Sequence, residues 1–143
     1  MNVSQRGIDL IKSFEGCKLK AYKCPAGVWT IGWGCTGKDI KEGLVWSQEQ
    51  ADSALAKHLD EFSRGVSDLL KVPVTQGQFD ALVSFAYNVG LKALRDSTLL
   101  RMLNSGDYSG AAGQFCRWIN KGTAFEAGLR RRREAERQTF AGA

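Results

Sequence analysis

The amino-terminal residues place apolar side chains three positions apart, which is the spacing of one helix face. These side chains belong to Ile8, Ile11 and Phe14. Ser4 can cap this helix, because its hydroxyl can accept a hydrogen bond from a backbone N–H of the first turn. Gly16 is a natural stop, because glycine tolerates the left-handed conformation in which many helices end. The pattern therefore predicts a short first helix between these two residues.

A much longer helix is predicted over residues 48–70. Its apolar face repeats every three or four positions and consists of Ala51, Ala54, Leu55, His58, Leu59, Phe62, Val66 and Leu69. Ser47 and Gln50 have the spacing of a capping box, and Pro73 ends the pattern. At ~1.5 Å per residue, such a helix is roughly 35 Å long, enough to connect two lobes of a small protein.

Helical spacing returns in the second half of the chain. Thr75 and Gln78 form another capping box, and the helix that they open closes at Asn88 and Gly90. Further helices are expected over residues 97–104, 108–119 and about 129–140, with a loop over residues 120–128.

Residues 17–45 follow a different pattern, in which glycines separate aromatic and β-branched residues. Such segments are typical of short strands joined by turns, and residues 25–27 form a turn signal. The strands are expected around Tyr22, Val28, Trp29, Ile31 and Trp33. The predicted fold class is therefore α+β, mostly α. We expect one domain over residues 1–143, with a small β lobe (15–46), a linking helix (47–70) and a helical lobe (71–143 with 1–14).

Composition narrows the classes of function. The chain has 143 residues, 43% of them hydrophobic and 24% charged, which is typical of a soluble globular protein. No segment approaches the ~20 apolar residues that span a bilayer, so we expect no stable membrane insertion. The net charge of +5 favours an anionic partner, and part of it lies in the run Arg130–Arg133. Acidic residues surround that run and no recognised nucleic-acid fold accompanies it, so we expect no nucleic acid partner.

Glu15, Cys24 and Thr30 are the candidate catalytic residues. Glu15 lies at the expected junction of the first helix with the β lobe. A carboxyl group partly withdrawn from water there would suit general-acid catalysis, although a glutamate at a helix end is more often simply solvated.

The whole of residues 15–34 resembles the active-site segment of phage-type lysozymes, glycoside hydrolase family 24. Their pattern is Glu, eight residues, Asp or Cys, five residues, Thr, and then Ile-Gly-aromatic-Gly. Later segments are also similar to family segments, so the resemblance covers nearly the whole chain: Val72–Leu82, Phe85–Gly90, Ser97–Leu100 and Gly128–Glu134.

The resemblance implies a lysozyme-like fold and hydrolysis of the β-1,4 bond between N-acetylmuramic acid and N-acetylglucosamine in peptidoglycan. It implies that Glu15 protonates the glycosidic oxygen and that Cys24 and Thr30 position or activate the attacking water. Five further residues fall where family members line the sugar cleft: Thr36, Tyr87, Asn88, Leu99 and Gln114. Neither the resemblance nor the cysteine spacing implies a metal or another cofactor.

Two departures from the family pattern leave alternatives open. Cys24 stands where most members have Asp, and Cys35 where most have His. A disulfide of Cys24 with Cys17 or Cys35 would close the site until it is reduced. A catalytically weak module that only binds the cell wall, or a lytic transglycosylase, is the competing interpretation.

The implied biological role is that of an endolysin, which releases phage progeny by host lysis. The segment before Ser4 has no apolar signal-peptide core, so we expect accumulation in the host cytoplasm until lysis, and then action in the periplasm and cell wall. A separate holin-type protein would give access to the wall. We expect the chain to act on peptidoglycan as a monomer.

Overall fold

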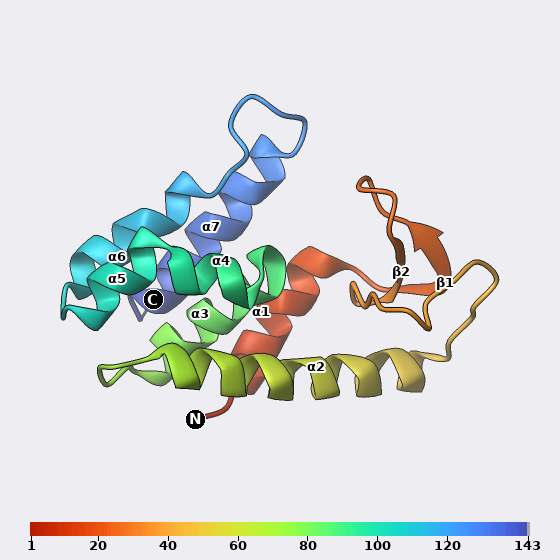
Figure 1. Ribbon diagram of the computed structural model, residues 1–143, viewed down its shortest axis with the longest axis horizontal. Coiled ribbons are helices and arrows are strands. Elements are labelled where there is room, and N and C mark those ends of the chain that lie inside the picture. The colour runs from red at the N-terminus through yellow and green to blue at the C-terminus, as the bar shows by residue number, and fades with distance from the viewer. Residues whose placement is uncertain (143) are drawn as a thin grey trace.

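The long helix α2 (Gln48–Leu69) runs beneath both lobes of the molecule (Figure 1). The structure is a computed structural model and describes residues 1–142. The capping box is confirmed, because the Ser47 hydroxyl accepts a hydrogen bond from the Gln50 N–H (3.1 Å) and the Gln50 side chain accepts one from the Ser47 N–H (2.8 Å). The helix ends one residue earlier than predicted and connects the two lobes, as its length suggested.

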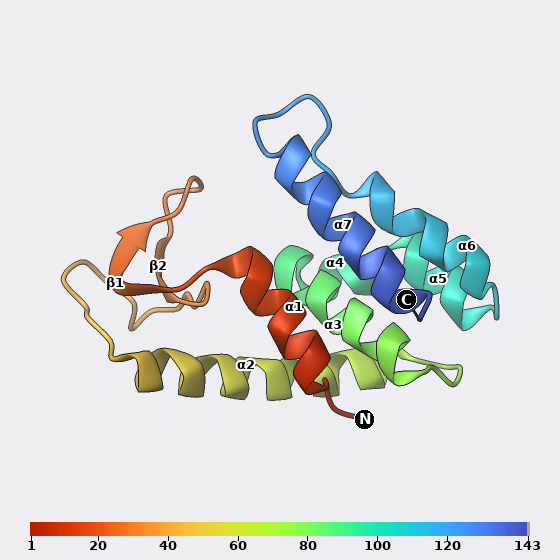
Figure 2. The ribbon, with the colours of Figure 1, turned by 180° about the vertical axis from the view of Figure 1, so that it is seen from behind.

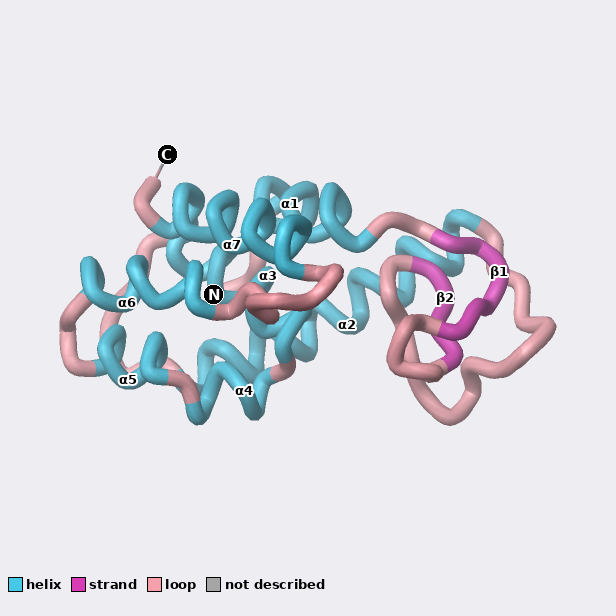
Figure 3. The backbone as a smooth tube through the Cα atoms, turned by 90° about the horizontal axis from the view of Figure 1, so that it is seen from above, coloured by secondary structure: helices cyan, strands magenta, loops and turns pink. Residues whose placement is uncertain are grey.

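The small lobe contains an antiparallel pair of strands, β1 (Lys18–Lys23) and β2 (Trp29–Gly32). Tyr22 pairs with Thr30 across this sheet. The predicted turn closes with a hydrogen bond of 2.8 Å from the Gly27 N–H to the Cys24 carbonyl. Val28 and Trp33, both expected in strands, lie just outside β2. Figure 3 shows that this lobe stands apart from the helices and joins them through α2 and the segment after α1.

The larger lobe is built from short helices around α3. Their bounds are α1 (Gln5–Glu15), α3 (Gln76–Val89), α4 (Leu91–Asp96), α5 (Thr98–Asn104), α6 (Tyr108–Gln114) and α7 (Glu126–Phe140), with a 3₁₀ turn over Phe115–Arg117. Residues Phe79–Ala86 of α3 are all buried, because α1, α2 and α7 pack around them (Figure 2). A helix that is buried on every side is expected to be mostly apolar, and the two polar side chains of this stretch, Asp80 and Ser84, are hydrogen-bonded to Ser4 and Glu136.

The predicted fold class is confirmed, with three local corrections. The helix expected over residues 108–119 becomes 3₁₀ after Gln114. The last helix begins at Glu126, three residues early, because the Glu126 side chain accepts hydrogen bonds from the Gly122 N–H (2.8 Å) and from Arg130 (3.0 Å) in the expected loop. The short helix α4 was not predicted. Among the described residues, no helix is long and apolar enough to cross a membrane.

Candidate active site

Glu15 is the last residue of α1 and lies where the two lobes meet. Gly16 follows it with a φ of +66°, which turns the chain away towards β1. The Glu15 carboxylate accepts a hydrogen bond from Arg132 of α7 at 3.2 Å. The Glu15 side chain is 17% exposed and that of Arg132 only 4%, so the carboxylate has one buried cationic partner and one open side.

A buried network holds the Arg132 guanidinium in place. Arg132 donates to Glu136 at 3.2 Å and to the Ser84 carbonyl at 3.0 Å. Glu136 is completely buried and also accepts hydrogen bonds from the Ser84 hydroxyl (2.6 Å) and from Arg133 (2.5 Å). Because every partner is fixed by packing of α3 against α7, the guanidinium presents Glu15 with a defined donor.

Gly34 brings the backbone of the β lobe close to this carboxylate. A Cβ atom at Gly34 would lie 3.3 Å from a Glu15 carboxylate oxygen, and the φ of +95° also favours glycine. Beside it, the Tyr87 hydroxyl donates to the Trp33 carbonyl at 2.7 Å. Burial, and to a lesser degree the charge of Glu15, raise the pKa of Tyr87 above its ordinary value. The hydroxyl therefore keeps its proton and its role as a donor between the lobes.

The β lobe supplies Cys24 and Thr30. The backbone of Val28 and Ala26, and to a lesser degree the Thr30 side chain, hydrogen-bond to the Cys24 thiol and hold its pKa below the ordinary value. Thr30 is almost fully buried, and its hydroxyl donates to the Val28 carbonyl at 3.0 Å. The turn after β1 thus makes Cys24 easier to deprotonate than an isolated thiol.

The Tyr22 hydroxyl lies within electrostatic range of both Cys24 and Glu15. Burial raises the pKa of the Tyr22 hydroxyl, and negative charge on Cys24 and Glu15 raises it further. Tyr22 also pairs with Thr30 in the sheet. The structure therefore brings the three predicted catalytic residues into one neighbourhood, with Tyr22 among them.

A cleft with a volume of about 980 Å³ lies beside Glu15. Its walls come from the end of α1, the turn at Pro25, and the loop and first turns of α7. The lining residues are Ser13, Phe14, Glu15, Pro25, Asn88, Asn120, Ala124, Phe125, Ala127, Gly128, Leu129, Arg131 and Arg132. An open cleft of this size, with a partly buried carboxylate in its wall, can admit an extended polymer to a general acid.

Only some of the predicted sugar-binding residues lie at the cleft. Asn88 lines the cleft, and its side chain accepts a hydrogen bond from Arg133. Tyr87 lies next to Glu15 and ties the lobes together. Leu99 is wrong as a sugar contact, because it is 0% exposed and belongs to the hydrophobic core beneath α5. Thr36 and Gln114 are not among the residues that line the cleft, and their role stays a prediction.

The disulfides of Cys24 that were left open as an alternative are absent from the structure, in which all four cysteines are free. Cys17 and Cys24 lie at opposite ends of β1, about 20 Å apart at the rise of an extended strand. Cys24 pairs with Val28 and Cys35 with Ile31, which separates them by about 10 Å along the adjoining strand. A disulfide needs Cα atoms about 4.4–6.8 Å apart, so neither bond can form without movement of the backbone. The Sγ atom of Cys35 instead lies 3.6 Å from the Nε2 atom of His58.

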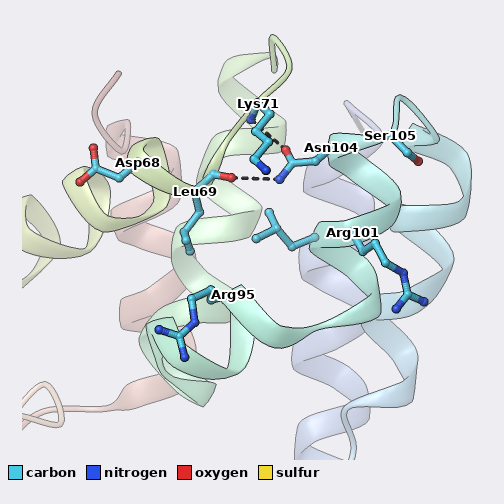
Figure 4. A pocket seen from close by; sticks show the side chains of 8 residues that line it. Asp68, Leu69, Lys71, Arg95, Arg101, Asn104 and Ser105 are labelled. Atoms are coloured by element: carbon cyan, nitrogen blue, oxygen red, sulfur yellow. Dashed lines mark hydrogen bonds between the residues drawn. The ribbon is translucent and has the colours of Figure 1, made fainter.

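A second cavity, of about 500 Å³, lies at the far end of α2 (Figure 4). Asn104 closes it by donating to the Leu69 carbonyl and accepting from the Lys71 N–H, both at 2.9 Å. None of the residues grouped around Glu15 lines this cavity. The candidate active site is therefore the cleft at Glu15.

Sequence reasoning assigned no role in the site to Gly34, Ser84, Arg132 or Glu136. Two of them had a local signal: Gly34 ends the motif of residues 15–34, and Glu136 follows Arg132 by four positions and can pair with it on one helix face. Gly34 and Ser84 matter through contacts with residues that are distant in the sequence. Such contacts leave no periodic pattern.

Comparison with known proteins shows which family of proteins this chain resembles. The family model described as phage lysozyme matches residues 12–136. An endolysin of Bacillus phage B103 is 53% identical over 142 residues, which are 98% of this chain and 54% of that protein, so the chain spans about half of it. An endolysin of Acyrthosiphon pisum secondary endosymbiont phage 1 is 42% identical over 98% of both chains. The solved muramidase domain of SpmX from Asticaccaulis excentricus is 40% identical over 97% of both chains, with a TM-score of 0.88.

Proposed function

The chain belongs to the phage lysozyme family, which consists of glycoside hydrolases, and we propose that it hydrolyses the β-1,4 bond between N-acetylmuramic acid and N-acetylglucosamine in bacterial peptidoglycan. One observation carries this proposal. The Glu15 carboxylate stands in the wall of a cleft of about 980 Å³, held by the buried Arg132 at 3.2 Å, with its other side open.

In the proposed reaction, Glu15 gives its proton to the glycosidic oxygen as the bond to the anomeric carbon breaks. Positive charge then develops on the sugar ring. A Cys24 thiolate would stabilise this charge in place of the usual carboxylate, and the turn that lowers the pKa of Cys24 supports that role. Thr30, beside Cys24, would position the water that attacks the anomeric carbon. That water releases one proton to solvent and the Glu15 carboxylate takes one up, which restores the acid and completes the hydrolysis.

The test is the loss of turbidity of bacterial walls stripped of their outer membrane. Glu15→Gln keeps the shape of the side chain and removes its acidic proton, so the rate should fall by at least about 100-fold. Glu42→Gln, an exposed change on the β lobe, is the matched control and should lyse walls like the wild type. Full activity of Glu15→Gln would contradict the proposal. A wild type that sediments with walls but never lyses them would favour the wall-binding module.

We also propose that the chain serves as an endolysin and acts as a monomer. Peptidoglycan lies outside the inner membrane, so an enzyme made in the host cytoplasm needs a route across it. A separate holin-type protein would open that route at lysis, after which the enzyme works in the periplasm and cell wall. Expressing the chain in a host with and without a pore-forming membrane protein tests this, because lysis should follow only when both are present.

A further inference from the structure

The cavity at the far end of α2 lies where that helix meets α4 and α5 (Figure 4). Its volume of about 500 Å³ is within the range of ligand sites in proteins. Helix α2 begins at the β lobe, and its 22 residues place the cavity about 30 Å from that end of the helix. A ligand held here, in the α2–α5 cavity, would therefore leave the candidate active site free.

Three basic side chains from three different segments line the α2–α5 cavity. Lys71 follows α2, Arg95 belongs to α4 and Arg101 to α5, and all three are exposed. Among residues 1–142, neither the Lys71 amine nor the Arg101 guanidinium has a hydrogen bond or an ion pair. Arg95 pairs with Asp96 at 3.1 Å, but more than half of each side chain is exposed, so this pair is weak and open to exchange. The cavity therefore carries positive charge that the protein itself does not neutralise.

The other lining residues give the cavity a floor that is partly apolar and partly fixed by hydrogen bonds. Leu69 and Leu100 supply apolar surface. The Asn104 side chain donates to the Leu69 carbonyl and accepts from the Lys71 N–H, both at 2.9 Å, so it is held in place. Asp68 is the only carboxylate among the described residues that line the cavity, and Figure 4 shows its side chain directed away from Asn104. An anion in the cavity would thus meet cations and carbon surface.

The three cations surround the cavity and do not converge on one point. In Figure 4 the guanidinium groups of Arg95 and Arg101 extend from opposite sides, and the Lys71 amine lies between them in this view. A small anion would reach only one of these groups, whereas a chain with repeated negative charges can pass all three. Phosphates suit these partners, because a guanidinium binds two phosphate oxygens with parallel hydrogen bonds and an ammonium binds phosphate as a point charge.

We propose that the α2–α5 cavity binds a phosphodiester polymer of the bacterial cell wall, with successive phosphates paired to Lys71, Arg95 and Arg101. The carbon chain between the phosphates would contact Leu69 and Leu100. The proposal goes beyond the hydrolysis proposed above and rests on it only for placing the enzyme in the wall. An enzyme attached to the polymer at one site and to the glycan at another stays near its substrate, because the second binding event becomes intramolecular.

The test compares walls of a Gram-positive bacterium before and after extraction with cold hydrofluoric acid, which cleaves phosphodiester bonds and leaves the glycan and its peptides. Kd for sedimentation with the walls is measured in a Glu15→Gln background, so that the walls stay intact. On untreated walls, Lys71→Gln together with Arg101→Gln should raise Kd about fivefold, as expected for the loss of two exposed ion pairs. On extracted walls, this double variant should match its parent. Lys38→Gln together with Lys57→Gln removes the same charge from exposed positions outside the cavity and should match the parent on both preparations.

An unchanged Kd of the double variant on untreated walls, or an equal rise on both preparations, overturns the proposal. Duplex DNA is the competing polyanion. If it binds the parent more tightly than the extracted polymer does, and the double variant weakens that binding, the partner is nucleic acid and the proposal is wrong. Lysis is scored separately with the wild type. A wild type that lyses neither preparation contradicts the hydrolase function, while the binding ratios still decide the role of the α2–α5 cavity.

Discussion

Cys24 differs from the other cysteines in the surroundings of its thiol. Hydrogen bonds from the backbone of Val28 and Ala26 lower its pKa, whereas burial raises the pKa of Cys35 and of Cys116. Because the thiolate is the reactive form, Cys24 should react with iodoacetamide at pH 7 before Cys35 and Cys116 do. Peptide mass spectrometry over a time course of alkylation measures the order.

A substitution at Thr30 tests whether hydrogen bonds to the Cys24 thiol lower its pKa. Thr30→Val keeps the size of the side chain and removes its hydroxyl, so the pKa of Cys24 should rise and its alkylation should slow, while Cys35 and Cys116 keep their rates. Cys24→Ser should remove the fast-reacting site altogether. Faster labelling of Cys35 than of Cys24 in the wild type would show that burial does not control thiol reactivity here.

At the scale of secondary structure elements, the packing of α3 against α7 depends on Glu136. This completely buried carboxylate balances two guanidinium groups, those of Arg132 and Arg133. Glu136→Gln leaves both cations without their buried counter-ion, which should lower the free energy of unfolding by about 3–5 kcal/mol. Urea denaturation measures the change. Lysis should weaken as well, because Arg132 would lose the partner that holds it against Glu15.

Glu134→Gln is the control on the same helix. Glu134 pairs with Arg137 near the surface, where an ion pair contributes only about 0–1 kcal/mol. If both variants lose the same stability, the buried network does not hold α3 and α7 together.

Features that are complete within a few residues could be predicted from the sequence, whereas features that depend on distant contacts could not. Helix starts at Ser47 and Thr75 were predictable, because a capping box is complete within four residues. Helix α4 was not, because six residues are too few for a periodic pattern to emerge. Glu15 and Thr30 were found through a local motif, whereas the contact of Glu15 with Arg132 joins residues 117 positions apart. Leu99 was assigned to the cleft by resemblance, and only packing shows that it lies in the core.

At the scale of the whole molecule, Trp33 ties the β lobe to the helices. Its indole N–H donates to Asp52 of α2 at 2.8 Å, and its carbonyl accepts from Tyr87 of α3 at 2.7 Å. Lys12 of α1 lies 3.8 Å from Asp52 and 5.1 Å from the centroid of the Trp33 ring. Three helices thus converge on one residue of the small lobe, two through its side chain and one through its backbone carbonyl.

Because Asp52 is a carboxylate, the stability that its contact with Trp33 provides should depend on pH. Hydrogen bonds from Trp33 and then Gln48 hold the pKa of Asp52 below its ordinary value. A carboxyl with a lowered folded-state pKa stabilises the fold above its unfolded pKa of about 3.9, and that contribution is lost as the pH falls through the folded value. Asp52→Asn should therefore lower Tm at pH 7 but have little effect near pH 2.

Calorimetry at several pH values measures how the Tm values of the wild type and of Asp52→Asn approach each other as the pH falls. The Tm of the wild type should fall more steeply below about pH 4 than that of Asp52→Asn, because only the wild type has this carboxylate to protonate. Asp39→Asn, an exposed change within the β lobe, should follow the wild type at every pH. Parallel curves for the wild type and Asp52→Asn would mean that the lobes are held by packing and by the Tyr87 hydrogen bond, without help from the charge of Asp52.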